Sequence, residues 1–433
     1  MRRLTLSLLL VLAASPACAQ QLRVYFIDVD QGNAALLVAP GGESLLVDSG
    51  NNGDGSRVRS VLAAAGITAL DAYLTTHYHS DHYGGVDELA RAPAITIRDV
   101  YDRGDKAFLP ASKTGDARYR EYDTTFGRRA RHLQRGETVP LGTVSVTCIA
   151  SGGVVLGEQN PQPGHDENDM SVAVLVTWRG FRLFLGGDIE RFTERKIADL
   201  DAVSDVDVYE ADHHGSDSST SSAFIRELAP NVVIVSNGDD AQYQHPRQAT
   251  LDTLARLQPA PVVFQTNRYT KGGKGGNVDT AFIADLEPSG PEGTILLSVD
   301  ADSGQYRVSF RNTSRTFAMK HRIAPTARVV LERLLPDPVG RDADREEVTV
   351  RNRGPGPVEL TGWYLQDESG RRWPLAGLGT LAAGASATTV RNGFPLNLNN
   401  DGDTILLMNA LGEAEDRFTY GPVTEGAVVV TGH

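Results

Sequence analysis

The chain has 433 residues, of which 40% are hydrophobic and 22% are charged, a composition typical of folded globular proteins. This length exceeds one ordinary domain, so we expect at least two. Lys and Arg number 42 against 55 Asp and Glu, and the net charge of −13 argues against unselective binding of polyanions by the whole surface. A local basic groove is still compatible with this balance.

The N-terminus has the parts of a secretory signal peptide. Two arginines precede an apolar stretch at 4–14, and an Ala-x-Ala cleavage site follows at 17–19. We therefore expect a signal peptide at 1–19 and a secreted or periplasmic protein, with a lipoprotein anchored at Cys18 as the lesser alternative. The apolar stretch is too short to span a bilayer, and no transmembrane segment is expected in the mature chain.

From 21 to 311, short apolar strands alternate with helical segments, which predicts a mixed α/β domain. The expected strands are 22–29, 34–38, 44–47, 70–75, 171–178, 181–185, 206–209, 232–235 and 262–265. The expected helices are 57–65, 189–200, 222–228 and 248–257.

The periodicity fades between Tyr101 and Arg135, where basic residues alternate with Tyr119, Tyr122 and Phe126. The basic residues are Arg103, Lys106, Lys113, Arg118, Arg120, Arg128, Arg129, Arg131 and Arg135. Such a segment could hold a phosphate backbone and stack bases. Acidic residues lie among the basic ones, so an ordinary solvated surface is an equal alternative.

A second domain is expected at 327–430, after a linker at 312–326. Short alternating runs there are separated by Gly, Pro, Asn and Asp, a pattern typical of a small all-β sandwich. We expect Trp363 and Trp373 in its core.

Four metal-binding side chains lie within six residues, directly after the apolar run that ends at Thr75. They are His77, His79, Asp81 and His82. Imidazole nitrogens and carboxylate oxygens are ligands of divalent first-row cations. A turn of this length cannot point four groups at one ion, so we expect two adjacent half-sites and a dinuclear centre.

Further candidate ligands follow later strands. Asp188 comes after one apolar run, His213 and His214 after the next, and His245 after a third, across a longer loop. In layered α/β folds, binding sites form where successive strands end at one crevice. We therefore expect these side chains to join the first motif.

Together these motifs resemble the metallo-β-lactamase superfamily, and most closely the soluble hydrolase domain of ComEC-type competence proteins. The resemblance covers 21–310 and rests also on 26–34, 47–50, 168–171 and 244–246. It implies an αββα sandwich that binds two divalent metal ions, with Zn the first expectation and Mn the second.

The resemblance also implies how the ligands divide between the metals. His77 and His79 would hold one metal, Asp81, His82 and one of His213 and His214 the other, and Asp188 would bridge them. The third ligand of the first metal has no clean match, and the candidates are His165, Asn168 or water. Asp28 and Asp48 would orient imidazoles, or else cap turns.

The expected catalytic residues are Asp81 and His245. Two metals lower the pKa of a shared water toward ~7, so a metal-bridging hydroxide would attack the substrate and no protein nucleophile is needed. His245 would protonate the leaving oxygen or bind phosphate, or else be a structural turn histidine.

The second domain resembles a lamin-tail domain, an immunoglobulin-like sandwich, on the segments 346–352, 360–365 and 396–403. Such modules accompany nucleases and phosphatases in secreted bacterial proteins. The expected role is therefore to bind a surface or nucleic acid.

The function expected from the sequence is that of a secreted phosphodiesterase or nuclease, with extracellular DNA or RNA as the candidate substrate. Two alternatives stay open. One is a hydrolase of small esters, lactams or phosphocholine-like groups, and the other is a largely non-catalytic surface-binding protein.

Overall fold

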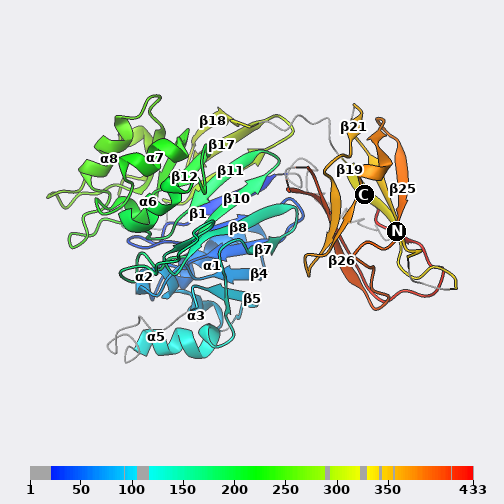
Figure 1. Cartoon of the computed structure of the whole chain (residues 1–433). Coiled ribbons are helices and arrows are strands. Elements are labelled where there is room, and N and C mark those ends of the chain that lie inside the picture. The colour runs from blue at the N-terminus through cyan, green and yellow to red at the C-terminus, as the bar shows by residue number, and fades with distance from the viewer. Residues whose placement is uncertain are drawn as a thin grey trace, which may run out of the picture.

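The computed structural model describes residues 21–432 except 92, 105–116, 288–292, 322–328, 341–343, 355 and 411. The expected signal peptide, Lys106 and Lys113 therefore lie outside the described residues. Two large sheets and their flanking helices form the first domain, and a separate group of strands forms the second (Figure 1).

The first sheet has nine strands and is mixed. Its spatial order is β18 (Thr313–Ala318), β17 (Gln305–Phe310), β16 (Ile295–Asp300), β1 (Leu22–Phe26), β2 (Ala35–Val38), β3 (Ser44–Val47), β4 (Ala69–Leu74), β5 (Thr96–Asp102) and β6 (Arg131–His132). The strands from β3 to β6 are parallel, and the others pair antiparallel.

The second sheet is also mixed. Its spatial order is β15 (Ile283–Asp285), β14 (Val262–Asn267), β13 (Val232–Val235), β12 (Val208–Glu210), β11 (Phe181–Leu185), β10 (Ala173–Trp178), β8 (Val144–Ser151) and β7 (Thr138–Leu141), with β9 (Val154–Val155) paired to β8. The strands from β11 to β15 run parallel. Their carboxyl ends therefore meet at one edge.

The two sheets pack face to face because the strands present apolar side chains to each other. Val24, Leu37 and Leu74 of the first sheet share one buried cluster with Val174 and Leu183 of the second. Burial of such side chains stabilises each by about 1.5–3 kcal/mol relative to exposure. This cluster is the central layer of the domain.

Helices cover the outer face of each sheet and complete the expected αββα sandwich (Figure 1). The first sheet carries α1 (Gly55–Ala65), α2 (Ser80–Tyr83), α3 (Val86–Leu89) and α5 (Ala117–Tyr122). The second carries α6 (Arg191–Asp199), α7 (Ser222–Leu228) and α8 (Gln248–Ala255). In α1, Val58 and Leu62 lie one turn apart and both are buried. The helix ends at Gly66, whose left-handed φ of 79° suits glycine.

The first domain extends further than the sequence indicates. Residues Thr313–Ala318, expected in the linker, form the edge strand β18, which pairs along its whole length with β17. Arg311, with a φ of 47°, turns the chain back between the two strands. Its side chains are mostly exposed at the sheet edge, so the strand needs few apolar residues and gives no clear apolar pattern in the sequence.

The second domain consists of strands without α-helices among its described residues. One sheet has the order β25 (Ser386–Val390), β20 (Glu347–Asn352), β19 (Val329–Leu335) and β28 (Val429–Val430). Another has the order β23 (Arg372–Pro374), β22 (Tyr364–Asp367), β26 (Asp403–Met408) and β27 (Ala414–Tyr420), and β21 (Val358–Glu359) pairs with β24 (Thr380–Leu381). Trp363 and Trp373 are buried in the shared core, as expected.

Candidate metal centre

The loop after β4 carries the first histidine motif, and one buried carboxylate fixes its shape. Asp48, which follows β3, accepts hydrogen bonds from the backbone N–H and the hydroxyl of Thr76, both at 2.8 Å. The same carboxylate lies 2.7 Å from Nδ1 of His82. Asp48 therefore joins the start of the loop to the short helix α2 at its end.

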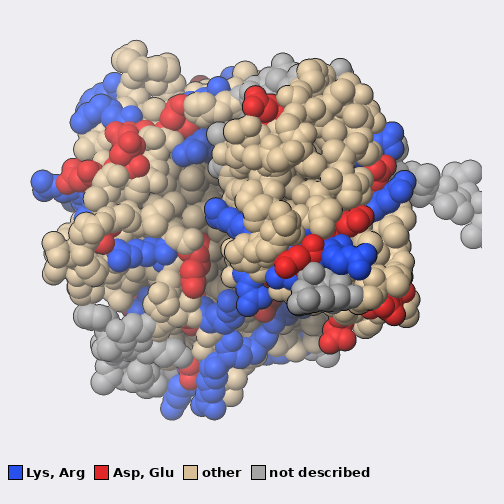
Figure 2. Space-filling model, turned by 45° about the vertical axis from the view of Figure 1, so that its right-hand side comes forward, with Lys and Arg blue, Asp and Glu red and all other residues tan. Residues whose placement is uncertain are grey.

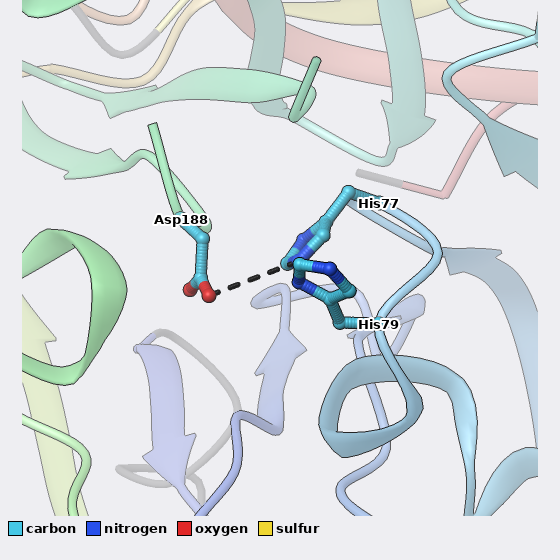
Figure 3. A group of neighbouring side chains, drawn as sticks. All are labelled: His77, His79 and Asp188. Atoms are coloured by element: carbon cyan, nitrogen blue, oxygen red, sulfur yellow. Dashed lines mark hydrogen bonds and ion pairs between the residues drawn. The ribbon is translucent and has the colours of Figure 1, made fainter. Parts of the chain in front are cut away.

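Three ligand atoms meet on one side of the site. Nε2 of His77 lies 3.0 Å from Nδ1 of His79 and 3.7 Å from Oδ2 of Asp188. The three side chains point toward one another from two different loops (Figure 3). Their ligand atoms all lie within 4.8 Å of one another, close enough to share one ion. We call this group the first half-site.

A second group lies on the other side of Asp188. Nε2 of His214 is 3.4 Å from Oδ2 of Asp81, and Nε2 of His82 is 4.0 Å from the same oxygen. Their ligand atoms also lie within 4.8 Å of one another. The other oxygen of Asp188, Oδ1, is 3.2 Å from Nε2 of His82. Asp188 thus presents one oxygen to each half-site.

The tautomers of two imidazoles favour a cation here. Nδ1 of His214 lies 3.0 Å from the carbonyl oxygen of Ser236, which can only accept, so Nδ1 donates. Nδ1 of His82 donates in the same way to the carboxylate of Asp48. When the two rings are neutral, each Nε2 carries a lone pair that is directed at carboxylate oxygens, and neither Nε2 has a hydrogen-bond partner among the described residues. Such an arrangement fits a divalent metal ion.

The electrostatics keep the bridging carboxylate charged. In the metal-free site, burial opposes ionisation of Asp188, but the positive charge of the protonated imidazoles around it, His82 first, holds its pKa well below the usual range. A charged carboxylate between two imidazole groups is available to bind cations on both sides.

The turn that holds Asp188 depends on the two glycines before it. A Cβ on Gly186 would lie 1.9 Å from Oδ1 of Asp212, and Gly187 has a φ of 62°. Only residues without a side chain let β11 pass this close to the loop after β12. The Gly-Gly-Asp sequence is therefore explained by the packing of two neighbouring loops.

His213 and His214 point to different sides because both have left-handed backbones, with φ of 49° and 56°. His214 groups with Asp81 and His82, whereas Nε2 of His213 lies 3.8 Å from Oδ2 of Asp188, the oxygen that faces His77. Nδ1 of His213 is 3.1 Å from Glu190 Oε1.

The two side chains expected as a third ligand for the first metal behave differently. His165 is exposed and stacks on Phe192, with ring centroids 4.0 Å apart, and it does not line the cavity. Asn168 does line the cavity, and its amide donates to Glu190 at 3.2 Å. Its Oδ1 is buried without a hydrogen-bond partner. His213 and Asn168 are thus the neighbours of the first half-site.

A cavity of about 300 Å³ opens over both half-sites. Its lining residues are Gln31, His79, Ser80, Asp81, Asn168, Asp188, His213, His214, Tyr243 and His245. The ring of His245 lies 5.3 Å from that of His213. Burial, together with the neighbouring imidazoles, lowers the pKa of His245 to about 3, so its ring is neutral at neutral pH.

The two acidic residues expected to orient imidazoles have separate roles. Asp48 contacts His82, as described above. Asp28 accepts hydrogen bonds from Asn267 at 2.6 Å and from the backbone N–H groups of Asp30 and Gly293 at 3.1 and 3.0 Å. Asp28 therefore ties loops together, and none of its contacts within the described residues is with an imidazole.

The aromatic residues expected to stack bases are part of the core instead. Tyr119, Tyr122 and Phe126 are each at most 4% exposed. The rings of Tyr119 and Tyr122 lie 5.6 and 6.1 Å from Tyr78, which sits between His77 and His79 in sequence. The apolar face of α5 thus supports the metal-binding loop.

A buried ion pair that the sequence pattern did not reveal also supports this loop. Arg103 is fully buried, and its guanidinium contacts both carboxylate oxygens of Glu167, at 2.8 and 2.7 Å. Glu167 in turn accepts the backbone N–H of Tyr78 at 2.7 Å. Arg103 also lies 4.4 Å from the centre of the Tyr78 ring. Arg103, counted by the sequence among the basic residues that could bind phosphate, is therefore a core residue, and its pairing with Glu167 was not predicted because the two residues are far apart along the chain.

Comparison with known families agrees with this geometry. Residues 27–238 match the Metallo-beta-lactamase superfamily, and residues 323–422 match the Lamin Tail Domain. The chain carries a metallo-beta-lactamase domain followed by a lamin tail domain. The first domain is therefore that of a metal-dependent hydrolase, and its two half-sites are the expected place for divalent metals.

Two bacterial proteins are similar to the first domain of this chain. ComE operon protein 3 of Bacillus subtilis is 27% identical over 258 residues, which is 56% of this chain and 31% of the relative. Recombination protein 2 of Haemophilus influenzae is 26% identical over 240 residues, 54% of this chain and 26% of the relative. The chain thus matches less than a third of the length of either relative. The resemblance to ComEC-type proteins is confirmed for this region.

Comparison with solved structures gives matches of low TM-score and low sequence identity. A putative metal-dependent hydrolase from Parabacteroides distasonis has a TM-score of 0.35 and 15% identity, with 56% of this chain and 92% of that chain covered. Zn(2+)-bound PqqB from Methylobacterium extorquens has a TM-score of 0.34 and 15% identity, with 54% and 85% covered. Within the described residues, no helix is both long enough and apolar enough to cross a membrane.

Proposed function

We propose that this protein is a secreted phosphodiesterase that acts on nucleic acid through two metal ions. The observation that carries the proposal is the position of Asp188, which presents one carboxylate oxygen to each half-site. The imidazole-rich ligand set favours Zn over Mn. Residues 1–19 would direct export, and the lamin tail domain would bind a surface or the substrate.

The charge of the cavity attracts an anionic substrate only when metal ions are bound. Asp81, Asp188 and Glu190 contribute three negative charges at the site, which would repel a phosphodiester. Two divalent cations contribute four positive charges, so the loaded site is attractive to a single phosphate. When bound, such a pair also activates water and neutralises charge that develops on the phosphate.

A water nucleophile suits the side chains in the cavity. Ser80 and Tyr243 are the hydroxyl residues among those that line it, and within the described part of the chain no hydrogen bond joins either hydroxyl to a basic side chain. Acyl or phosphoryl transfer to serine requires such a base. The neutral ring of His245 would donate a hydrogen bond to a phosphate oxygen from the edge of the cavity.

Exposed arginines offer a path for the rest of a polyanion. Figure 2 shows Lys and Arg gathered at the bottom of the molecule, where Figure 1 places α5. Arg118 and Arg120 of α5 are exposed, as are Arg128, Arg129 and Arg131 further along the chain. They are the part of the basic segment that supports nucleic-acid binding, since its aromatic side chains are buried.

The test is metal analysis of the purified protein, followed by rates on plasmid DNA, RNA, methyl p-nitrophenyl phosphate and a chromogenic β-lactam. We expect close to two metal ions per chain and hydrolysis of the phosphodiesters. Asp188→Asn should lose metal and activity together, whereas Asp199→Asn, at an exposed carboxylate on α6, should lose neither.

If the enzyme hydrolyses the β-lactam and none of the phosphodiesters, its substrate is a small cyclic amide and the proposed phosphodiesterase activity is wrong. Full activity of Asp188→Asn without bound metal would reject the mechanism. Mass spectrometry of the exported protein from a bacterial host tests cleavage after residue 19.

A further inference from the structure

One exposed aromatic side chain stands at the rim of the metal cavity. Tyr243 is 45% exposed, and no other Tyr, Phe or Trp in the described part of the chain is as open to solvent. Its ring lies 6.2 Å from that of His245, and both residues line the cavity. Leaving an aromatic face in water has a cost, so its presence beside the ligands needs an explanation.

The turn that carries Tyr243 is held in one conformation. Oδ1 of Asp240 accepts hydrogen bonds from the backbone N–H groups of Gln242 at 2.6 Å and Tyr243 at 3.1 Å. Gln244 follows with a left-handed φ of 58°, and its backbone N–H donates to the carbonyl of Asp240 at 2.9 Å. Because the backbone is fixed, the ring is placed before any ligand arrives, which lowers the entropic cost of binding.

A glycine-rich loop with two lysines packs against this turn. The backbone N–H of Lys274 donates to Oε1 of Gln244 at 2.8 Å, and its carbonyl accepts from Gln248 at 3.0 Å. Gly276 donates to the carbonyl of Pro246 at 2.8 Å. Gly273 has a left-handed φ of 74°, which favours glycine, and a Cβ there would lie 2.4 Å from Oε1 of Gln244.

The two lysines of this loop differ in their partners. Nζ of Lys271 lies 3.1 Å from Oδ2 of Asp239, which neutralises its charge. Lys274 is exposed, and no ion pair to its ammonium group occurs within the described residues. An exposed cation, held by its backbone next to the turn of Tyr243, is thus available to an anion near the cavity.

We propose that Tyr243 and Lys274 form a nucleotide-binding subsite and that the substrate is single-stranded nucleic acid. The ring of Tyr243 stacks on the base next to the phosphate held in the cavity, and Lys274 binds a neighbouring phosphate. Stacking needs a base whose face is free, and in a duplex both faces are covered by adjacent bases. This inference rests on the proposed phosphodiesterase activity, whose substrate class it narrows.

The first experiment compares two substrates in the metal-loaded enzyme. Replacing Tyr243→Ala should lower kcat/KM on a single-stranded oligothymidylate by about 5- to 150-fold, the value of one stacked base. Hydrolysis of methyl p-nitrophenyl phosphate, which has no base, should change by less than about twofold. Tyr243→Phe keeps the ring and should retain wild-type kcat/KM on both substrates. Equal losses on both substrates, or a wild-type enzyme that cleaves duplex DNA as fast as single strands, would overturn the proposal.

The second experiment measures binding without turnover. A fluorescein-labelled phosphorothioate oligothymidylate is titrated by anisotropy at several salt concentrations. Lys274→Ala should reduce the slope of log K against log salt by about 0.7, the value for one contact to a single strand. Lys271→Ala, in the same loop but already paired, is the matched control and should leave the slope unchanged. An unchanged slope in Lys274→Ala, or a reduced one in Lys271→Ala, would reject the role of Lys274.

These measurements separate the two proposals. If the strand binds through Tyr243 but no phosphodiester is hydrolysed, the subsite stands and the proposed activity fails. If phosphodiesters are hydrolysed but Tyr243→Ala binds the strand as well as wild type, the activity stands and the subsite fails. Thermal melts of each variant exclude unfolding as the cause of a loss.

Discussion

Asp48 and His82 form a fully buried pair, with the carboxylate 2.7 Å from Nδ1 of the imidazole. The carboxylate also accepts two hydrogen bonds from Thr76, so one side chain sets both the course of the loop and the tautomer of a ligand. The metal-binding capacity of His82 thus depends on a residue that touches no metal-facing atom.

Replacing Asp48→Asn should weaken metal binding. The amide cannot accept all the hydrogen bonds that the carboxylate accepts, so His82 loses its orienting partner. We expect affinity for one of the two metals to fall by about 10- to 100-fold. Competition with a fluorescent chelator measures this. Asp99→Asn, at an exposed position on β5, is the control, and equal affinity in the two variants would contradict the assigned role.

Removing the charge of Arg103 should destabilise the first domain. Arg103→Met leaves Glu167 as a buried charge without its partner, a loss that typically costs about 3–5 kcal/mol. Urea unfolding monitored by Trp fluorescence gives the free energy of unfolding. The double variant Arg103→Met with Glu167→Gln should recover part of the loss, because it removes the unpaired charge. No difference between the single and double variants would count against the ion pair.

Gly186→Ala should disrupt the metal centre through packing alone. The added methyl group would overlap the carboxylate of Asp212, and such overpacking usually costs about 1–3 kcal/mol. Bound metal should fall along with stability, because the turn at Asp188 must move. Gly377→Ala, where a Cβ meets nothing within 4 Å, is the control and should melt like wild type.

The contribution of Glu194 to the stability of the metal-free protein should fall as the pH rises from about 4.5 to 7. Burial raises the pKa of Glu194 from 4.5 to about 7, against opposing hydrogen bonds from the backbone of Ser221 and Thr220. The folded state therefore binds this proton more tightly than the unfolded state. Its contribution is complete below pH 4.5 and is lost as the pH passes 7.

The pH effect can be assigned by substitution. Each pKa unit corresponds to about 1.4 kcal/mol, so the effect is a few kcal/mol at most. Glu194→Gln cannot ionise, so the unfolding free energy of this variant should depend less on pH over this window than that of wild type, with the buried Glu210 and Glu415 still titrating there. A variant whose pH dependence equals that of wild type would show that another group is responsible.

The arginines of α5 should affect only long substrates. Arg118→Gln with Arg120→Gln should raise KM for nucleic acid and lower the salt slope by up to about 1.4, while small diesters react as before. Arg195→Gln with Arg226→Gln removes the same charge from α6 and α7 and is the control. A similar change in both double variants would mean that only net charge matters. Deleting the whole segment is uninformative, because Tyr119 and Tyr122 are core residues.

Much of the metal site follows from local sequence. The spacing from His77 to His82 is short enough that a single turn brings the four side chains to one place, and strand ends position Asp188 and His214 near them. Parallel strands β11, β12 and β13 are neighbours, so the loops after them meet at one edge of the sheet. The type and local spacing of the ligands were thus enough to predict a site for divalent metals. The patterns of apolar residues were enough to predict one α/β domain and one all-β domain.

Side-chain direction and burial depended on contacts between distant segments. The left-handed backbones of His213 and His214 send their rings to opposite sides of Asp188, which no periodicity reveals. Tyr119 is buried because α5 packs against Tyr78. Tyr243 is exposed because its turn lies at the rim of the cavity. The burial of Tyr119 and the positions of the His213 and His214 rings depend on contacts with residues more than twenty positions away in the chain, which local sequence patterns do not encode.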